Sequence, residues 1–425
     1  MSGASIFPTP RRAAAQQEFT PKEHIMPGPG AYLSDREETD EVLEVLRSGH
    51  LSRNGSPDDP KFLHKVETLE QEFAAKMGAR YCVAVNSGTG ALMAALVAAG
   101  IGPGSEVLVP GYTFVATYSA VIAVGAVPVL VEIDESLTMD PADARQKITP
   151  RTRAVIPVHM LGNPCDMAAL TALAEEHHLT VIEDACQALG GSYRGKRLGT
   201  LGALGAFSLN NYKVINSGDG GLLITDSEDL YAKAYGFHDQ GHRPLRRGVE
   251  IGSRTLIGIN MRMNELSGAY ALAQLRKLDR ILVLLREKKA RFKQAIASAH
   301  LEGLSFRKIH DPEECATLLT VQLEDVSTAQ QVARALKSKT VDRSGWHVYN
   351  NMEQILAYAG PDGQPLYRQH MLPRTDDILA RSINLSVGVV DPGLGADFGI
   401  NVLSGEDEID RKAEEFIRLV KPVTG

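Results

Sequence analysis

The sequence predicts an α/β fold: a large domain with a mostly parallel sheet between helices, followed by a smaller C-terminal α+β domain. Between residues 81 and 184, short continuous apolar runs alternate with helical segments, which is typical of parallel strands buried on both faces. Residues 264–300 form one long helical run rich in Leu, Ala, Arg and Lys, whose length suits a connector between two domains. Beyond residue 301, strand-like and helix-like segments are mixed.

Each element follows from its local pattern. Strands are expected where short apolar runs end at turn residues: 81–86, 106–110, 127–133, 154–159, 179–184 and 318–323. Helices are expected at 90–99, 117–124, 141–147, 167–177, 264–300, 327–337 and 407–419. We expect an N-terminal arm at 1–30, extended and partly disordered, a large domain at 31–280 and a small domain at 281–425.

Composition excludes several classes of protein. The 425 residues contain 45 basic and 52 acidic side chains, and the net charge of −7 is spread without blocks, so we expect no nucleic-acid partner and no binding to an anionic membrane. Glycine and proline interrupt the sparsely charged stretch 80–132, so it is too broken to span a membrane. Four widely spaced cysteines form no C-x-x-C pair, and the N-terminus lacks the apolar run of a signal peptide. We therefore expect buried thiols, no metal site and a cytoplasmic location.

Four turns that follow strands carry the chemistry, because ligands of parallel sheets bind beyond the carboxyl ends of the strands. The first is 86–92 (NSGTGAL), where small residues before a helix let backbone N–H groups approach a phosphate and Thr89 adds a hydroxyl donor. The same residues also suit an ordinary helix N-cap, and this alternative stays open. In the second turn, Phe114 follows the strand at 106–110 and could either stack on a flat cofactor ring or belong to the core.

The third and fourth turns carry charged side chains. Asp184 closes an apolar strand and could bind a protonated heterocyclic nitrogen; the alternative is a surface carboxylate at the strand end. Lys213 lies between a strand that holds Ser208 and the glycine turn 217–221. A lone lysine is usually a solvated charge, but an amine held near a cationic ring has a lowered pKa and becomes a Schiff-base nucleophile.

Together these turns resemble the pyridoxal 5′-phosphate (PLP) site of fold-type I enzymes, and the sequence more closely resembles the DegT/DnrJ/StrS family of sugar aminotransferases. The resemblance covers nearly the whole chain from about Met26 onward. It rests on motifs in the family's order: 49–53 (GHLSR), 86–92, 110–117, 157–159 (PVH), 183–187 (EDACQ), 208–213 (SLNNYK) and 258–263 (GINMRM). It implies a fold-type I large domain with a seven-stranded sheet. Gly90 departs from the family, which more often has alanine there.

By this resemblance, PLP is the cofactor and Lys213 is the lysine that binds it as a Schiff base. Asp184 would pair with the pyridine nitrogen, which keeps that nitrogen protonated. Phe114 would stack on the ring, and Gln187 would hydrogen-bond the phenolic oxygen.

The resemblance also implies how the phosphate is held. Gly88, Thr89 and Ser208 would bind it within one chain. Asn260 matches the family residue that reaches the phosphate from the second subunit. A homodimer with shared active sites is therefore expected.

The implied function is transfer of an amino group from glutamate or glutamine to a keto sugar or related ketone, giving an amino sugar or aminocyclitol. A deoxysugar dehydratase or lyase on the same fold is one alternative. Dehydrating members place histidine at the position of Lys213, and some hold an iron–sulfur cluster with cysteines, so this chain fits them less well. A non-catalytic PLP-binding regulator is the other alternative, against which the intact Lys213, Asp184 and Gln187 argue.

The residues do not choose the donor, the acceptor or the ring position. The segments 163–166, 238–242 and 345–349 are candidates to reach the substrate. A packed or surface histidine is the preferred interpretation of His159, His238, His242 and His347.

Overall fold

The computed structural model describes residues 28–424, apart from 57, 245–251, 253 and 361–362. Most of the predicted arm at 1–30 therefore lies outside the described residues. Of its last three residues, Gly28 donates its amide to the carbonyl of Asn211, and the short helix α1 (Pro29–Tyr32) follows. None of the described helices is both long and apolar enough to cross a membrane.

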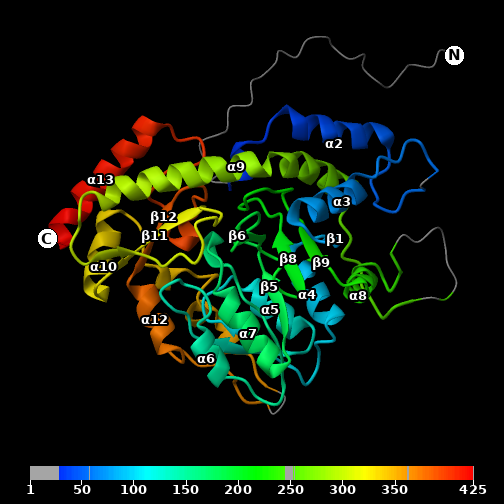
Figure 1. Cartoon of the computed structure of the whole chain (residues 1–425), viewed down its shortest axis with the longest axis horizontal. Coiled ribbons are helices and arrows are strands. Elements are labelled where there is room, and N and C mark those ends of the chain that lie inside the picture. The colour runs from blue at the N-terminus through cyan, green and yellow to red at the C-terminus, as the bar shows by residue number, and fades with distance from the viewer. Residues whose placement is uncertain (1–27, 57, 245–251, 253, 361–362, 425) are drawn as a thin grey trace, which may run out of the picture.

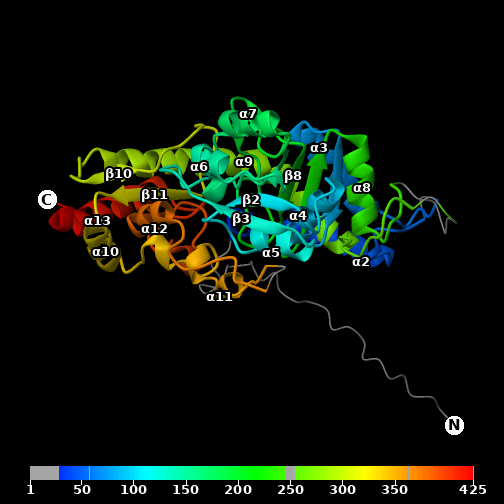
Figure 2. The ribbon, with the colours of Figure 1, turned by 90° about the horizontal axis from the view of Figure 1, so that it is seen from below.

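A seven-stranded, mostly parallel sheet forms the centre of the larger part of the molecule (Figures 1 and 2). Its order is β1-β9-β8-β5-β4-β2-β3, and β9 runs antiparallel to both of its neighbours. The bounds are β1 (Tyr81–Val85), β2 (Glu106–Pro110), β3 (Val127–Val131), β4 (Thr152–Val155), β5 (Thr180–Asp184), β8 (Leu204–Ser208) and β9 (Gly221–Thr225). A small separate hairpin consists of β6 (Ser192–Tyr193) and β7 (Lys196–Arg197). Because the other six strands point the same way, their carboxyl ends meet at one edge.

Alternating strand residues face two hydrophobic cores, one on each side of the sheet. In β1, Cys82 and Ala84 face the core shared with α3, α7 and α9, whereas Val83 and Val85 face the core shared with α4, α5 and α8. Burial on both faces explains why the strands are continuous apolar runs in the sequence. The helices of this part are α2 (Arg36–Ser48), α3 (Lys65–Met77), α4 (Gly88–Ala98), α5 (Ala116–Ala123), α6 (Pro141–Gln146), α7 (Met167–His177), α8 (Glu228–His238) and α9 (Glu265–Ala297).

The long helix α9 joins the seven-stranded sheet to a smaller, three-stranded one (Figure 1). In its first half, Arg276 pairs with Glu72 of α3, and near its end Arg291 pairs with Glu406 and Asp410 of the C-terminal helix. The smaller sheet is antiparallel, in the order β10-β11-β12. The elements after α9 are β10 (Leu304–Phe306), β11 (Leu318–Leu323), α10 (Val326–Ala335), α11 (Glu353–Leu356), α12 (Pro373–Ala380), β12 (Ser382–Ser386) and α13 (Glu406–Thr424).

The structure confirms the predicted α/β class with a mostly parallel seven-stranded sheet, and it differs in detail. Helix α4 begins at Gly88 rather than at 90, because the Ser87 hydroxyl accepts a hydrogen bond from the Gly90 amide and caps the helix earlier. Helices α2 and α3 and the antiparallel β9 are additions that the sequence pattern did not predict. The boundary proposed near residue 280 falls inside α9 and stays a prediction.

The close crossing of α3 and α9 depends on Gly268. A Cβ atom there would lie 2.6 Å from Val66 Cγ2 and 3.0 Å from the Val66 backbone nitrogen. Gly268→Ala should therefore lower the thermal midpoint, because overpacking costs about 1–3 kcal/mol. Gly345→Ala is the control, since Gly345 has no positive φ and its added Cβ would meet no atom within 4 Å beyond its two chain neighbours. At an unobstructed position inside a helix, alanine stabilises the helix by about 1 kcal/mol relative to glycine. A raised thermal midpoint for Gly268→Ala would therefore contradict the tight crossing.

Candidate active site

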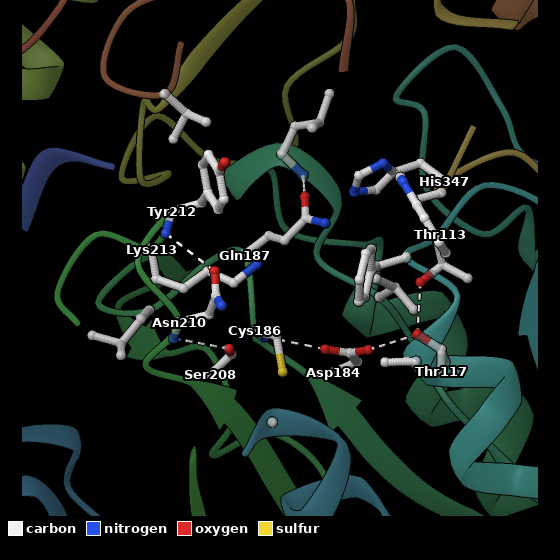
Figure 3. Close-up of a pocket in the computed structure, with 18 of the residues that line it drawn as sticks. Thr113, Thr117, Asp184, Cys186, Gln187, Ser208, Asn210, Tyr212, Lys213 and His347 are labelled. Atoms are coloured by element: carbon white, nitrogen blue, oxygen red, sulfur yellow. Dashed lines mark hydrogen bonds between the residues drawn. The ribbon is translucent and has the colours of Figure 1, made fainter. Parts of the chain in front are cut away.

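The carboxyl ends of the parallel strands open into a cavity of about 510 Å³. Seven of the eight predicted site residues line it: Gly88, Thr89, Phe114, Asp184, Gln187, Ser208 and Lys213. They come from the turns after β1, β2, β5 and β8. In Figure 3, the side chains of Lys213, Gln187 and Asp184 surround the same space. The structure thus brings these residues together, while the role of each toward a cofactor stays a prediction.

Asp184 is a buried carboxylate with two fixed hydrogen-bond donors. It ends β5 and is 5% exposed. Its Oδ2 accepts a hydrogen bond from the Thr117 hydroxyl at 2.8 Å, and its Oδ1 accepts one from the Cys186 amide at 3.1 Å. The Thr117 hydroxyl in turn lies 2.7 Å from that of Thr113, so the three side chains form a row (Figure 3). The alternative of a surface carboxylate is therefore wrong.

Lys213 lies in a tight turn after β8 and points into the cavity (Figure 3). Its amide donates to the Asn210 carbonyl at 2.9 Å, and the Asn210 amide donates to Ser208 Oγ at 3.2 Å. Burial lowers the pKa of the Lys213 amine, although nearby Cys186 and Asp184 oppose the shift. More of the amine is therefore neutral near pH 7 than in a solvated lysine, which is the form that attacks a carbonyl.

The first turn of α4 forms an anion cradle. The amides of Gly88 and Thr89 belong to the start of the helix, where backbone N–H groups have no intrahelical acceptor and the helix dipole is positive. A Cβ atom at Gly88 would lie 2.8 Å from Ser208 Cβ and 3.0 Å from Cys186 Sγ, so only glycine allows this close approach. The two sequence interpretations are compatible: Ser87 caps the helix, and the amides that follow it stay available for an anion.

Gln187 is oriented by an unusual turn. The Leu161 amide donates to Gln187 Oε1 at 3.1 Å, which leaves Nε2 of Gln187 as the donor toward a ligand. Leu161 has a left-handed backbone (φ +55°), a conformation that costs energy in a branched residue. The buried guanidinium of Arg307 donates to the carbonyls of Met160 and Leu161, and these bonds hold the turn in place.

Phe114 and Asn260 lie in different surroundings. Phe114 is 39% exposed on the cavity wall, with its ring centroid 5.3 Å from that of His347, so the alternative of a core residue is wrong. Asn260 is exposed, and its side-chain oxygen accepts a hydrogen bond from the Arg262 amide at 3.2 Å. Within the described part of this chain, Asn260 does not line the cavity.

Other residues complete the lining, and only the segment 345–349 among them was a sequence candidate to reach the substrate. Thr117 lies in the 110–117 motif, but its sequence position gives no sign that it would bind Asp184. Trp346, His347 and Asp391 come from segments after β11. Trp346 and His347 belong to the candidate segment 345–349, and both line the cavity, although a packed or surface histidine was the preferred interpretation of His347. Asp391 had only the signal of a polar loop, because nothing local indicates which loop folds back over the sheet edge.

The donors and charges of the cavity fit PLP. A helix N-terminus with a closely packed glycine suits a phosphate, a buried carboxylate suits a protonated ring nitrogen, and an amine of lowered pKa suits an aldehyde carbon. In the described ranges, no group of three or more His, Cys, Asp or Glu side chains is arranged to hold a metal ion.

Comparison with known proteins supports the same conclusion. Residues 33–390 match the DegT/DnrJ/EryC1/StrS aminotransferase family. The chain is 39% identical over 275 residues to GDP-perosamine synthase of Caulobacter vibrioides, covering 63% of this chain and 71% of that protein. It is 40% identical over 264 residues to L-glutamine:2-deoxy-scyllo-inosose aminotransferase of Micromonospora echinospora, covering 60% of each.

Solved structures agree with these sequence matches. The crystal structure of S. venezuelae DesV superposes with a TM-score of 0.71 at 31% identity, covering 91% of this chain and 94% of that one. The family resemblance inferred from the motifs is therefore confirmed. The chain belongs to the DegT/DnrJ/EryC1/StrS aminotransferase family and is a PLP-dependent aminotransferase.

Proposed function

We propose that the enzyme transfers the amino group of glutamate or glutamine to the keto group of a sugar or cyclitol, giving an amino sugar or aminocyclitol. Two matched relatives carry names of this kind, one a perosamine synthase and one a glutamine-dependent inosose aminotransferase. The observation that carries the proposal is one cavity holding both a lysine of lowered pKa and a fixed, buried carboxylate. A dehydratase is disfavoured because Lys213, not histidine, occupies its position.

When bound, PLP supplies an electron sink that stabilises negative charge on the carbon next to the transferred nitrogen. Asp184 would pair with the protonated ring nitrogen, and its hydrogen bonds from Thr117 and the Cys186 amide fix the orientation of its carboxyl group. Lys213 accepts and returns a proton at Nζ, for which its lowered pKa makes it suitable near neutral pH.

The remaining predicted residues bind and orient the cofactor. The amides of Gly88 and Thr89 and the hydroxyl of Ser208 would bind the phosphate, and Phe114 would stack on the ring. Gln187 would donate its Nε2–H to the phenolic oxygen, because its own oxygen already accepts a hydrogen bond from the Leu161 amide.

His347 is a candidate to accept a hydrogen bond from a substrate hydroxyl. Burial, with the charge of Lys213 nearby, lowers the pKa of His347 to about 3, so its ring is neutral near pH 7. The Ser344 hydroxyl donates to the Gly393 carbonyl at 2.7 Å and so accepts from His347 Nδ1 at 3.1 Å. This arrangement leaves His347 Nε2 with a free lone pair.

We also propose a cytoplasmic homodimer with shared active sites. Asn260 lies on a segment that carries apolar side chains in solvent, Ile257 at 94% and Ile259 at 46% exposure, as expected of a surface that a second subunit covers. The four cysteines are free thiols, which suits a reducing compartment.

Amino-donor and acceptor assays test the function. Purified enzyme with PLP is given glutamate or glutamine together with either nucleotide-linked keto sugars or an inosose, and release of the keto acid is measured. We expect the enzyme to release more keto acid than it has active sites only when a sugar or cyclitol ketone is present. Loss of water from the sugar without keto-acid release would favour the dehydratase instead.

Asp184→Asn should retain PLP but lose turnover by about 10²-fold or more, the scale of losing one preorganised electrostatic partner. An amide cannot neutralise a protonated ring nitrogen, so the electron sink is weakened. Thr117→Val is the graded comparison, because it removes one of the donors that Asp184 accepts from but keeps the carboxylate. Bound cofactor with near-normal kcat in Asp184→Asn would show that the carboxylate has no such role.

Mixing two inactive variants tests the shared site. Asn260→Asp would set a carboxylate against the partner's cofactor phosphate, and Lys213→Ala removes the amine. If Asn260 serves the opposite subunit, a mixed dimer has one site with both lesions and one with neither. Activity should return to about a quarter of wild type after random exchange of equal amounts. Demonstrated subunit exchange without recovery would reject the shared site.

A further inference from the structure

A second cavity, of about 350 Å³, lies between the second half of α9 and the chain that runs from β10 to β11. It shares no lining residue with the cavity of the active site. Apolar side chains form much of its wall, among them Phe306, Ile309 and Leu319. Its charged lining consists of four cations and one carboxylate: Arg286, Lys289, Lys293, Arg307 and Glu314.

Two deeply buried cations in this cavity share one carboxylate. Lys289 is 6% exposed and Arg307 is 3% exposed. Lys289 Nζ hydrogen-bonds Glu314 Oε1, whereas Arg307 Nη2 lies 3.6 Å from Glu314 Oε2, too far for a hydrogen bond. Arg286 is paired separately with Glu313 at 2.8 Å. One buried positive charge is therefore left without a matching negative charge, and burying such a charge is costly.

The guanidinium of Arg307 is fixed and still has an unused donor. Its Nη1 and Nη2 donate to the carbonyls of Met160 and Leu161 at 3.2 and 3.0 Å. Its buried Nε has no hydrogen-bond partner among the described residues. Burial lowers the pKa of Lys289 to about 8 even though Glu314 opposes the shift, which is consistent with an excess of positive charge.

We propose that this cavity binds a small organic oxyanion, a carboxylate or phosphate monoester with a short apolar body, whose charged head contacts Lys289 and Arg307 beside Glu314. The two buried cations supply the charge, and the free N–H of Arg307 supplies a directed hydrogen bond. Lys293, whose ammonium lies 5.1 Å from the Phe306 ring centroid, adds positive potential at the side. The apolar wall favours an anion with a hydrocarbon body over a bare inorganic ion.

Calorimetric titration of the PLP-loaded enzyme tests the site, because bound PLP fills the phosphate cradle of the active site. The probes are butyrate, n-butyl phosphate and inorganic phosphate at constant ionic strength and pH 7. We expect saturable binding of at least one organic probe, with n-butyl phosphate several-fold tighter than inorganic phosphate. Stronger binding of butyrate identifies a carboxylate head, and stronger binding of n-butyl phosphate identifies a phosphate head.

Three variants locate the binding. In Lys289→Met, the one positive charge of Arg307 is matched by the one negative charge of Glu314, so this variant should fold. It should bind the preferred probe about tenfold more weakly or worse. Glu314→Gln removes the competing carboxylate and should bind that probe several-fold more tightly. Arg280→Met is the control, because it also removes one positive charge from α9 but at a position that does not line the cavity. It should change the affinity less than about twofold. Absence of saturable binding, or equal affinities in Lys289→Met and Arg280→Met, would overturn the proposal.

Discussion

The hydrogen-bonded burial of Asp184 is the interaction on which the active site depends. A carboxylate that is 5% exposed must be compensated, and donors from two neighbouring places compensate it: the Thr117 hydroxyl of α5 and the Cys186 amide after β5. These bonds fix α5 and the end of β5 relative to one another. The turn after β8 adds Lys213 to the same enclosed space, where burial lowers the pKa of its amine. One enclosed edge of the sheet thus holds a hydrogen-bonded carboxyl group and an amine whose pKa is lowered.

Arg307 connects this site to the C-terminal part of the chain. The turn at Leu161 has a left-handed backbone, and its polar groups are used on both sides: its amide bonds Gln187, and its carbonyl accepts from Arg307. The same guanidinium lines the second, cationic cavity. The orientation of Gln187 therefore depends on a residue that lies beyond α9, in the segment between β10 and β11.

The sequence predicted what is local and left open what is brought together from a distance. Asp184, Lys213 and the cradle at 86–92 follow strands directly, so the geometry of a parallel sheet was enough to place them at one edge. The segment of His347 was a candidate only through the family resemblance, and the Arg307–Lys289 pair could not be predicted, because no local pattern says which charges become buried together. The antiparallel β9 was also missed, since periodicity does not reveal strand direction.

Borohydride reduction of the PLP-loaded enzyme, followed by proteolysis and mass spectrometry, tests most directly whether Lys213 holds PLP in this cavity. Reduction fixes the cofactor covalently to the amine that holds it. A single modified peptide with the cofactor on Lys213 is expected. Less of this peptide should form in a variant that binds PLP more weakly. Modification of another lysine, such as Lys196 or Lys233, with Lys213 left free would contradict the site.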